Sequence, residues 1–325
     1  MKNGSSAVRV AGYAVVVVAA VAALASAGGL TAKNDPYWHS YKKSFGKTYG
    51  DAAEENYRYQ VFVENMKRAA EFAEIDPEAT YGMTSVSDRE PYELSGLRDI
   101  PAVHGNQVTV EVNHALPTSY DARSYGLVNS VRDQRQCGSC WAFATVAVME
   151  AGYKKAHGTL PQLSEQQLVD CDPNDSGCSG GWPERAFKYL KSSGLMKRSE
   201  YAYTARKGTC KYVSSKGIAK VKQIQSIRAN AANIMNAVYT YGAVAVALDA
   251  AKFNSYSSGI MNGAGCSKRP NHAVNVVGWG QTSSTPYWIV RNSWGTSWGE
   301  SGYIRIIRGN DACGIEDYPM VATVM

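Results

Sequence analysis

Residues 134–141 read Gln-Arg-Gln-Cys-Gly-Ser-Cys-Trp, and the apolar run Ala142-Phe-Ala-Thr-Val-Ala-Val-Met149 follows them. This run is good helix-forming sequence, and Gly158 is a typical stop signal. We therefore expect Cys140 at or just before the first turn of a buried helix. The unpaired N–H groups and partial positive charge of a helix N-terminus favour a thiolate over a thiol. The stretch thus predicts a reactive cysteine on the helix around which the rest of the chain is organised.

The chain has an odd number of cysteines, at positions 137, 140, 171, 178, 210, 266 and 313. In an oxidising compartment, three disulfides and one free thiol are the simplest account, although spacing alone leaves the pairs open. A Cys-x-x-Cys pair can also be redox-active or bind a metal. Redox use is disfavoured because Trp141 follows the pair and no βαβ unit surrounds it. A zinc site would need a second Cys or His pair at short spacing, so we expect no metal and no cofactor.

Two polar residues far downstream complete a candidate catalytic set. His272 opens the apolar strand His272-Ala-Val-Asn-Val-Val-Gly278, and Asn292 follows the next predicted strand. A histidine at the start of a strand is often only structural. Here the Asn292 amide is suited to orient an imidazole, and Trp294 to cover that hydrogen bond from water. A cysteine, a histidine and an orienting amide together predict nucleophilic catalysis.

Composition and charge divide the 325 residues into three parts. Two basic residues, an Ala- and Val-rich run at 11–24 and Ala25-Ser-Ala27 form a secretory signal layout for residues 1–27, with an uncleaved anchor as the alternative. Residues 28–115 carry nine Lys/Arg against fourteen Asp/Glu, and residues 116–325 carry twenty-three against fourteen. A segment of charge −5 ahead of a domain of +9 predicts that the two attract each other, unless the imbalance is chance. The basic residues form no dense stripe, so we expect no nucleic-acid binding.

Helical patterns come first along the chain and strand patterns later. Residues 34–74 predict two helices, the second capped by Asp51 and carrying Glu54 and Arg58 as an i, i+4 ion pair. Residues 79–115 have the composition of an irregular linker that crosses a surface. Beyond them, helices are predicted at 163–170 and 184–191, and strands at 243–248, 273–277, 287–290 and 303–307. A mainly helical subdomain, about 116–226, and a mainly strand subdomain, about 227–325, would hold a site in the cleft between them.

From about Pro36 to its end, the sequence resembles a papain-family cysteine peptidase precursor of the cathepsin L-like branch. The matching strings are Gln134 to Phe143, Cys178-Ser-Gly-Gly181, Asn271-His-Ala-Val274 and Asn292-Ser-Trp294, which are specific when they occur together in this order. The resemblance implies an α+β, papain-like fold of two subdomains, a helical left part and a β-barrel-like right part. It also implies an N-terminal α-helical inhibitory propeptide at 28–115 and a mature peptidase domain at 116–325.

The same resemblance assigns roles to residues. It implies that Cys140 is the nucleophile in a thiolate–imidazolium pair with His272, that Asn292 orients the imidazole, and that Gln134 and the Cys140 N–H form an oxyanion hole. The implied disulfides are Cys137–Cys178, Cys171–Cys210 and Cys266–Cys313, which leave Cys140 free. The implied substrate-binding residues are Gly180, Gly181, Trp182, Pro183, Ala247, Pro270, Asn271, Ala273 and Trp294.

The family pattern finally implies a biological setting and leaves some alternatives open. The expected protein is a monomeric endopeptidase, secreted or lysosomal/vacuolar, that is made as a zymogen and cleaves protein and peptide substrates with an apolar P2 residue. Its own propeptide would be an intramolecular inhibitor. Because the segment of charge −5 faces a domain of +9, we also expect acid to loosen the pair as carboxylates protonate. The segment between Gly314 and Tyr318 is shorter than is usual in the family, so basic P2 residues would also be accepted if Glu316 lines the pocket. A catalytically silent homologue that acts as a binding protein is the alternative class of function.

Overall fold

The structure is a computed structural model that describes residues 30–101 and 107–325. The predicted signal peptide, residues 1–27, lies outside these residues. Within the described part of the chain, no helix is long and apolar enough to cross a membrane.

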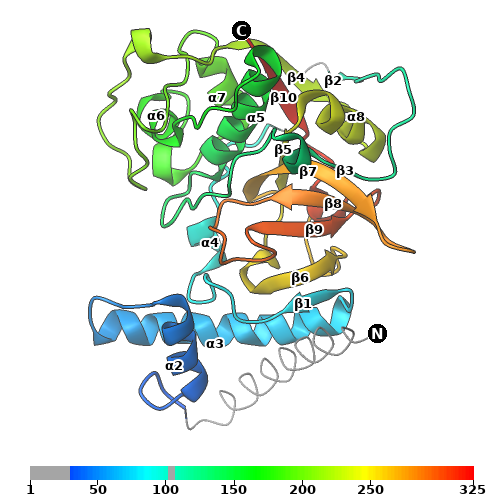
Figure 1. Cartoon of the computed structure of the whole chain (residues 1–325). Helices are drawn as coiled ribbons and strands as arrows, with labels where there is room; N and C mark the ends of the chain where they lie inside the picture. The colour runs from blue at the N-terminus through cyan, green and yellow to red at the C-terminus, as the bar shows by residue number, and fades with distance from the viewer. Residues whose placement is uncertain (1–29, 102–106) are drawn as a thin grey trace.

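The two helices predicted near the N-terminus are present, and each begins at an acidic cap. Helix α2 covers Pro36–Phe45, and the Asp35 carboxylate accepts hydrogen bonds from the first N–H groups of the helix. Helix α3 covers Ala52–Ile75, and Asp51 accepts from the Glu54 N–H. Each aspartate satisfies N–H groups that have no partner inside the helix. Figure 1 shows α2 and α3 together at the end of the molecule that lies below the strands.

The ion pair predicted between Glu54 and Arg58 is wrong. Arg58 is nearly buried and its Nη1 lies 2.7 Å from Oε2 of Glu93, whereas Glu54 is exposed and accepts from the Gly50 N–H. An ion pair between a guanidinium and a carboxylate contributes more free energy of stabilisation when it is partly buried than when it is exposed to water. Arg58 therefore joins α3 to a distant segment rather than to its own helix.

The segment after α3 is packed over much of its length, which corrects the predicted surface linker. Strand β1, Ala79–Tyr81, pairs antiparallel with β6, and helix α4, Pro91–Leu94, ends at a buried leucine. Between them the buried carboxylate of Asp88 accepts from the hydroxyls of Tyr41 and Tyr49. Strand β2, Gln107–Val108, pairs in parallel with β4. The polar composition that suggested a linker here serves internal hydrogen bonds.

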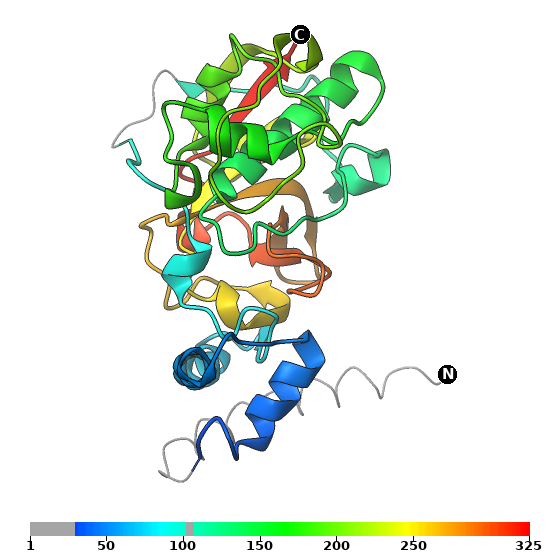
Figure 2. The ribbon, with the colours of Figure 1, turned by 90° about the vertical axis from the view of Figure 1, so that its left-hand side faces the viewer.

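The helices of the following domain surround one buried helix. Helix α5 covers Cys140–His157, its residues from Cys140 to Ala151 are buried, and it ends at Gly158, as predicted. The other helices are α6, Glu165–Cys171, α7, Pro183–Tyr189, and α8, Ala231–Tyr241. Figure 2 shows α5 to α7 at the end of the molecule opposite α2 and α3. Short 3-10 turns occur at Ala122–Tyr125, Gly177–Ser179, Ser214–Lys216, Phe253–Ser255 and Ala312–Gly314.

The strands form one ten-stranded sheet among the described residues, in the order β1-β6-β9-β8-β7-β5-β10-β4-β2, with β3 paired to β7. The four predicted strands are present as β5, Val244–Leu248, β7, His272–Gln281, β8, Pro286–Arg291, and β9, Tyr303–Ile307. Strands β3, Tyr120–Asp121, β4, Val221–Ile227, β6, Tyr256–Met261, and β10, Met320–Val324, were not predicted. The expected fold class, with mixed helix and strand and a helical N-terminal segment, is confirmed.

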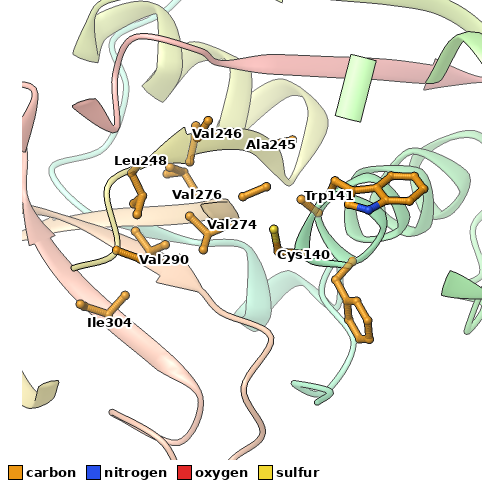
Figure 3. Packing of buried hydrophobic residues seen from close by; sticks show 14 of the residues in the cluster. Cys140, Trp141, Ala245, Val246, Leu248, Val274, Val276, Val290 and Ile304 are labelled. Atoms are coloured by element: carbon orange, nitrogen blue, oxygen red, sulfur yellow. The ribbon is translucent and has the colours of Figure 1, made fainter. Parts of the chain in front are cut away.

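The core lies between α5 and the central strands. Figure 3 shows Val246, Leu248, Val274, Val276 and Val290 packed together, with Cys140 and Trp141 of α5 beside them. Asn275 of β7 donates through Nδ2 to the Ala144 carbonyl of α5, 2.9 Å away. The helix that begins at Cys140 is therefore fixed to the strand that begins at His272.

The structure contains the three implied disulfides, Cys137–Cys178, Cys171–Cys210 and Cys266–Cys313. Among the described residues Cys140 is the one free cysteine. The Cys137–Cys178 bond holds the loop before α5 against the loop that carries Gly180 and Gly181.

Candidate active site

Cys140 is the first residue of α5 and has no exposed surface. The loop before it is rigid, because the Gly138 N–H donates to the Cys178 carbonyl at 2.9 Å and the Ser139 hydroxyl lies 2.7 Å from that of Tyr203. Burial raises the pKa of the Cys140 thiol to about 12, although backbone N–H groups, with those of Ala273 and Gly96 among them, oppose this. In this state the sulfur is a thiol, so the helix N-terminus does not outweigh the loss of water.

His272 begins β7 and is also fully buried. Its Nε2 lies 2.8 Å from Oδ1 of Asn292, and the Trp294 ring covers the imidazole at a centroid distance of 5.0 Å. Burial lowers the pKa of His272 to about 4, and the Asn292 hydrogen bond opposes this shift. Its Nδ1 atom has no hydrogen-bond partner among the described residues. The imidazole is therefore neutral, with one nitrogen fixed and the other unused.

Gln134 is completely buried and is oriented by Ser293, a residue that the sequence analysis missed. The Ser293 hydroxyl donates to Oε1 of Gln134 at 2.6 Å, so the Nε2 group of the same amide points away from Ser293. Nε2 then donates to the carbonyls of Cys137, at 3.0 Å, and Leu94, at 3.2 Å. The amide suggested for an oxyanion hole thus holds a carbonyl group of the N-terminal segment.

The segment around Gly96 lies in the cleft as an extended peptide. The Gly96 and Leu97 N–H groups donate to the Asn271 carbonyl, at 3.1 and 3.3 Å. On the other side the Gly181 N–H donates to the Gly96 carbonyl at 2.9 Å, and the Arg98 N–H to the Gly181 carbonyl at 3.1 Å. A Cβ on Gly96 would lie 2.3 Å from the Gly138 carbonyl oxygen, so only glycine passes this point without a clash.

The residues expected to form the P2 pocket come from both sides of the cleft. Ala247 of β5 and Ala273 of β7 are paired in register, and both are buried. Trp182 lies just before Pro183, the first residue of α7, and packs edge-on against Tyr318 at 5.5 Å. Pro270 lies two residues before His272 and is partly exposed.

Glu316, the possible acidic residue of that pocket, is engaged elsewhere. It is 6% exposed, and its Oε1 accepts from the Trp288 indole N–H at 3.0 Å and from the Gly309 N–H at 2.8 Å. This oxygen of Glu316 is therefore hydrogen-bonded to groups of the strand subdomain.

Two further aromatic residues support the site and were missed by the sequence analysis. The Tyr203 hydroxyl donates to the Gln134 carbonyl at 2.8 Å, and Phe253 meets the His272 ring edge-on at 6.2 Å. Tyr203 lies in a loop and Phe253 in a short 3-10 turn, and neither segment has a recognisable pattern, so the sequence carries no signal for them. Ser293 differs, because it stands inside the Asn292-Ser-Trp string that was recognised for other reasons.

Comparisons with known proteins show which family the chain resembles. Residues 116–323 match the papain family cysteine protease model, and residues 38–94 match the cathepsin propeptide inhibitor domain (I29). A probable cysteine protease of Arabidopsis thaliana, RD19B, is 38% identical over 316 residues, covering 90% of this chain and 87% of that protein. A cathepsin L-like proteinase of Fasciola hepatica is 40% identical, covering 90% of this chain and 96% of that protein. Digestive procathepsin L 3 of the Tenebrio molitor larval midgut has a TM-score of 0.79 at 31% identity, covering 88% of this chain and 98% of that chain. The chain therefore belongs to the papain family of cysteine proteases, hydrolases of peptide bonds, and carries the propeptide of a zymogen.

Proposed function

We propose that Cys140 is the nucleophile of a cysteine endopeptidase and His272 its acid–base partner. The observation that carries the proposal is the position of the free Cys140 thiol beside the backbone N–H of Ala273, the residue after His272. Asn292 meanwhile binds Nε2 of the His272 ring. Once the propeptide leaves, water and the N-terminus of α5 stabilise the thiolate, and the proton moves to the imidazole.

The steps then follow from the positions of these groups. The Cys140 sulfur attacks the scissile carbonyl carbon, and the oxyanion is bound by the Gln134 amide and the Cys140 N–H. The His272 imidazolium gives its proton to the leaving amine as the C–N bond breaks. Water, activated by the neutral imidazole, then hydrolyses the thioester and releases the acid. Asn292 and Trp294 keep the ring in one orientation throughout.

We place the functional boundaries as the sequence suggests them: signal peptide 1–27, propeptide 28–115 and peptidase domain 116–325. The two family matches, 38–94 and 116–323, lie inside the last two segments. The hydrogen bonds of Gly96, Leu97 and Arg98 in the cleft support a role of the propeptide as intramolecular inhibitor. We further propose a monomer that enters the secretory pathway and works in a lysosome, a vacuole or outside the cell.

Substrates in this proposal are proteins and peptides with an apolar P2 residue. Gly180, Gly181 and Asn271 would hold the substrate backbone, since their backbone groups lie where the propeptide strand runs. The pocket for P2 would be formed by Trp182, Pro183, Ala247, Pro270 and Ala273, none of which is charged. Because Oε1 of Glu316 already accepts hydrogen bonds from Trp288 and Gly309, apolar P2 residues are favoured over basic ones.

The test is active-site titration of the acid-matured protein with an epoxysuccinyl inhibitor of thiol peptidases, followed by mapping of the modified residue. We expect one equivalent of label, on Cys140, with loss of peptide hydrolysis, and no hydrolysis by a Cys140→Ser variant. Folded protein with an intact Cys137–Cys178 bond that takes no label would instead indicate the silent homologue. A strict preference for a charged P2 residue would refute the proposed pocket.

A further inference from the structure

Two buried carboxyl groups lie beside the glycines of the cleft. Asp172 and Asp175 are 2% and 6% exposed, in the loop that joins α6 to Gly180 and Gly181. The two side chains contact each other, and the Oδ2 atom of each has no proton donor among the described residues. Two carboxylates in contact away from water do not both stay charged, so the pair holds one proton between them.

Asp175 also fixes two groups that face the cleft. Its Oδ1 accepts from the Trp182 N–H at 3.0 Å and from Nε of Arg185 at 2.7 Å. A Cβ on Gly181 would lie 2.7 Å from the Asp175 carboxyl carbon, so this carboxyl group packs directly against the glycine. The carboxyl pair therefore positions both Gly181 and the guanidinium of Arg185.

Arg185 is the group that holds the propeptide beyond Gly181. Its Nη2 donates to the Arg98 carbonyl at 2.9 Å, and its Nη1 donates to the Asp99 carbonyl at 3.1 Å. Arg98 and Asp99 lie two and three residues after Gly96, and the Gly96 N–H lies at the Cys140 sulfur. A planar guanidinium anchored through Nε presents its two remaining nitrogens side by side, a geometry suited to consecutive acceptors.

We propose that Arg185, held in place by Asp172 and Asp175, binds backbone carbonyls of the substrate beyond its P2 residue. The ligand is an extended peptide with at least two more residues on that side of the cleft. A peptide that begins at P2 has no carbonyl that reaches Arg185. The inference rests on the proposed function, since it requires that substrates occupy the cleft in which the propeptide lies.

The shared proton makes this binding depend on pH. Burial, with the Asp175 charge adding to it, raises the pKa of Asp172 to about 7, although the Asn174 N–H opposes the shift. Below that pH the pair carries one negative charge, which Arg185 balances, and the shared proton holds the two carboxyl groups together. Above it the shared proton is lost and the two carboxylates repel each other, which displaces Asp175 from the position in which it fixes Nε of Arg185. The other titratable or charged groups that face this loop are Tyr189 of α7, Lys207 over Gly177, and Arg98 of the propeptide. Arg185 should therefore hold the substrate in acid and lose its position as the pH rises through about 7.

The experiment compares two peptides in matured enzyme whose concentration is fixed by active-site titration. Both have the same apolar P2 residue and scissile bond, and one carries two further alanines before P2. The values of kcat and KM are measured between about pH 5 and pH 8 for wild type, Arg185→Ala, Arg185→Lys and Asp172→Asn. Lys188→Ala is the matched control, because Lys188 is an exposed cation on the same helix whose ion partner is Glu184.

In acid, extension should raise kcat/KM of the wild type about tenfold, mainly through KM, as hydrogen bonds to a charged group commonly do. The ratio of kcat/KM for the longer peptide to kcat/KM for the shorter one should fall toward one in Arg185→Ala and recover in part in Arg185→Lys. It should stay at the wild-type value in Lys188→Ala. The gain should fade near pH 8 in the wild type but persist in Asp172→Asn, whose amide cannot acquire the second charge. A wild-type ratio in Arg185→Ala, or the same pH dependence in Asp172→Asn, would overturn the inference. If neither peptide is hydrolysed, the proposed function fails and the inference fails with it; hydrolysis with an unchanged ratio overturns the inference alone.

Discussion

Replacing Asp76 by Asn should uncover the active site of the precursor, because Asp76 forms a buried ion pair across the boundary of the propeptide. Its Oδ2 lies 2.6 Å from Nζ of Lys252, and neither side chain has exposed surface. The same oxygen accepts from the Tyr81 hydroxyl, at 2.6 Å, and from the Asn262 N–H, at 3.1 Å. Among the described residues, no other ion pair joins residues 30–101 to the peptidase domain.

The size of the effect follows from the burial of both charges. Burial lowers the pKa of Lys252, and the Asp76 carboxylate opposes this shift. Asp76→Asn leaves the ammonium group buried without its counter-charge, which costs about 3–5 kcal/mol. The equilibrium between the covered and the open cleft should therefore shift by roughly two to four orders of magnitude. The peptidase domain itself is unchanged, because Asp76 lies in the proposed propeptide.

The assay is the initial rate at which an epoxysuccinyl inhibitor labels Cys140 in the intact precursor near neutral pH. Asp76→Asn should raise that rate by roughly the same two to four orders of magnitude. Glu64→Gln on the same helix is the control, because the Glu64 side chain forms ion pairs while it is 53% exposed. This substitution should change the labelling rate less than about fivefold. The double variant Asp76→Leu/Lys252→Met should label more slowly than Asp76→Asn, because no unpaired charge remains. A wild-type labelling rate in folded Asp76→Asn would refute the reasoning.

Three further outcomes test the site. In a Cys140→Ala precursor, where no thiol can pass its proton to the imidazole, acid should open the cleft, because the pKa of His272 is about 4 under the propeptide and returns toward its usual value of about 6.5 in an open cleft. The open state then binds the proton more tightly, so the equilibrium constant for the covered state is largest above about pH 6.5 and falls by up to about tenfold per pH unit between about pH 6.5 and 4; a pH-independent rate of propeptide removal by an added protease would contradict this. Gln134→Ala should lower kcat of the matured enzyme about 10²- to 10³-fold with little change in KM, whereas a rise in KM at constant kcat would count against an oxyanion hole. Ala247→Phe should fill the proposed P2 pocket and shift the kcat/KM preference from leucine toward alanine at P2, and an unaltered ratio of the two substrates would place the pocket elsewhere.

Local signals in the sequence were reliable where one residue determines one geometry. Asp51 caps the helix that was predicted to follow it, and Gly158 ends α5. His272 and Asn292 were chosen from two separated strings, and the structure joins them by a hydrogen bond. For the helix ends the signal lies in the residues next to the feature, whereas for His272 and Asn292 the resemblance to the family supplied the distant contact.

Partners that are far apart in the sequence could not be predicted in the same way. Arg58 has a carboxylate four residues before it, and helix periodicity favours that neighbour, yet it pairs with Glu93. Periodicity describes one helix and carries no information about the segment that packs on it. The pairing of Asp76 with Lys252 is hidden for the same reason.

The charge state of the catalytic pair also depends on the tertiary structure. The sequence places Cys140 at a helix N-terminus, which favours a thiolate, whereas the pKa of the buried thiol is raised to about 12. Desolvation is set by whatever covers the sulfur, and here that includes Gly96, far away in the sequence. The predicted ion pair therefore concerns the enzyme without its propeptide.

The strand order has a consequence for the mature domain that does not involve the cleft. The strands at the two ends of the sheet, β1 and β2, both belong to the proposed propeptide, so processing leaves β6 and β4 as its new edges. An uncovered edge presents unpaired N–H and C=O groups that can template pairing with another chain. The strands of the proposed propeptide thus cover both edges of the sheet until processing removes them. Once they are gone, the exposed side chain of Lys222 on β4 places a charge on one new edge, which discourages edge-to-edge association.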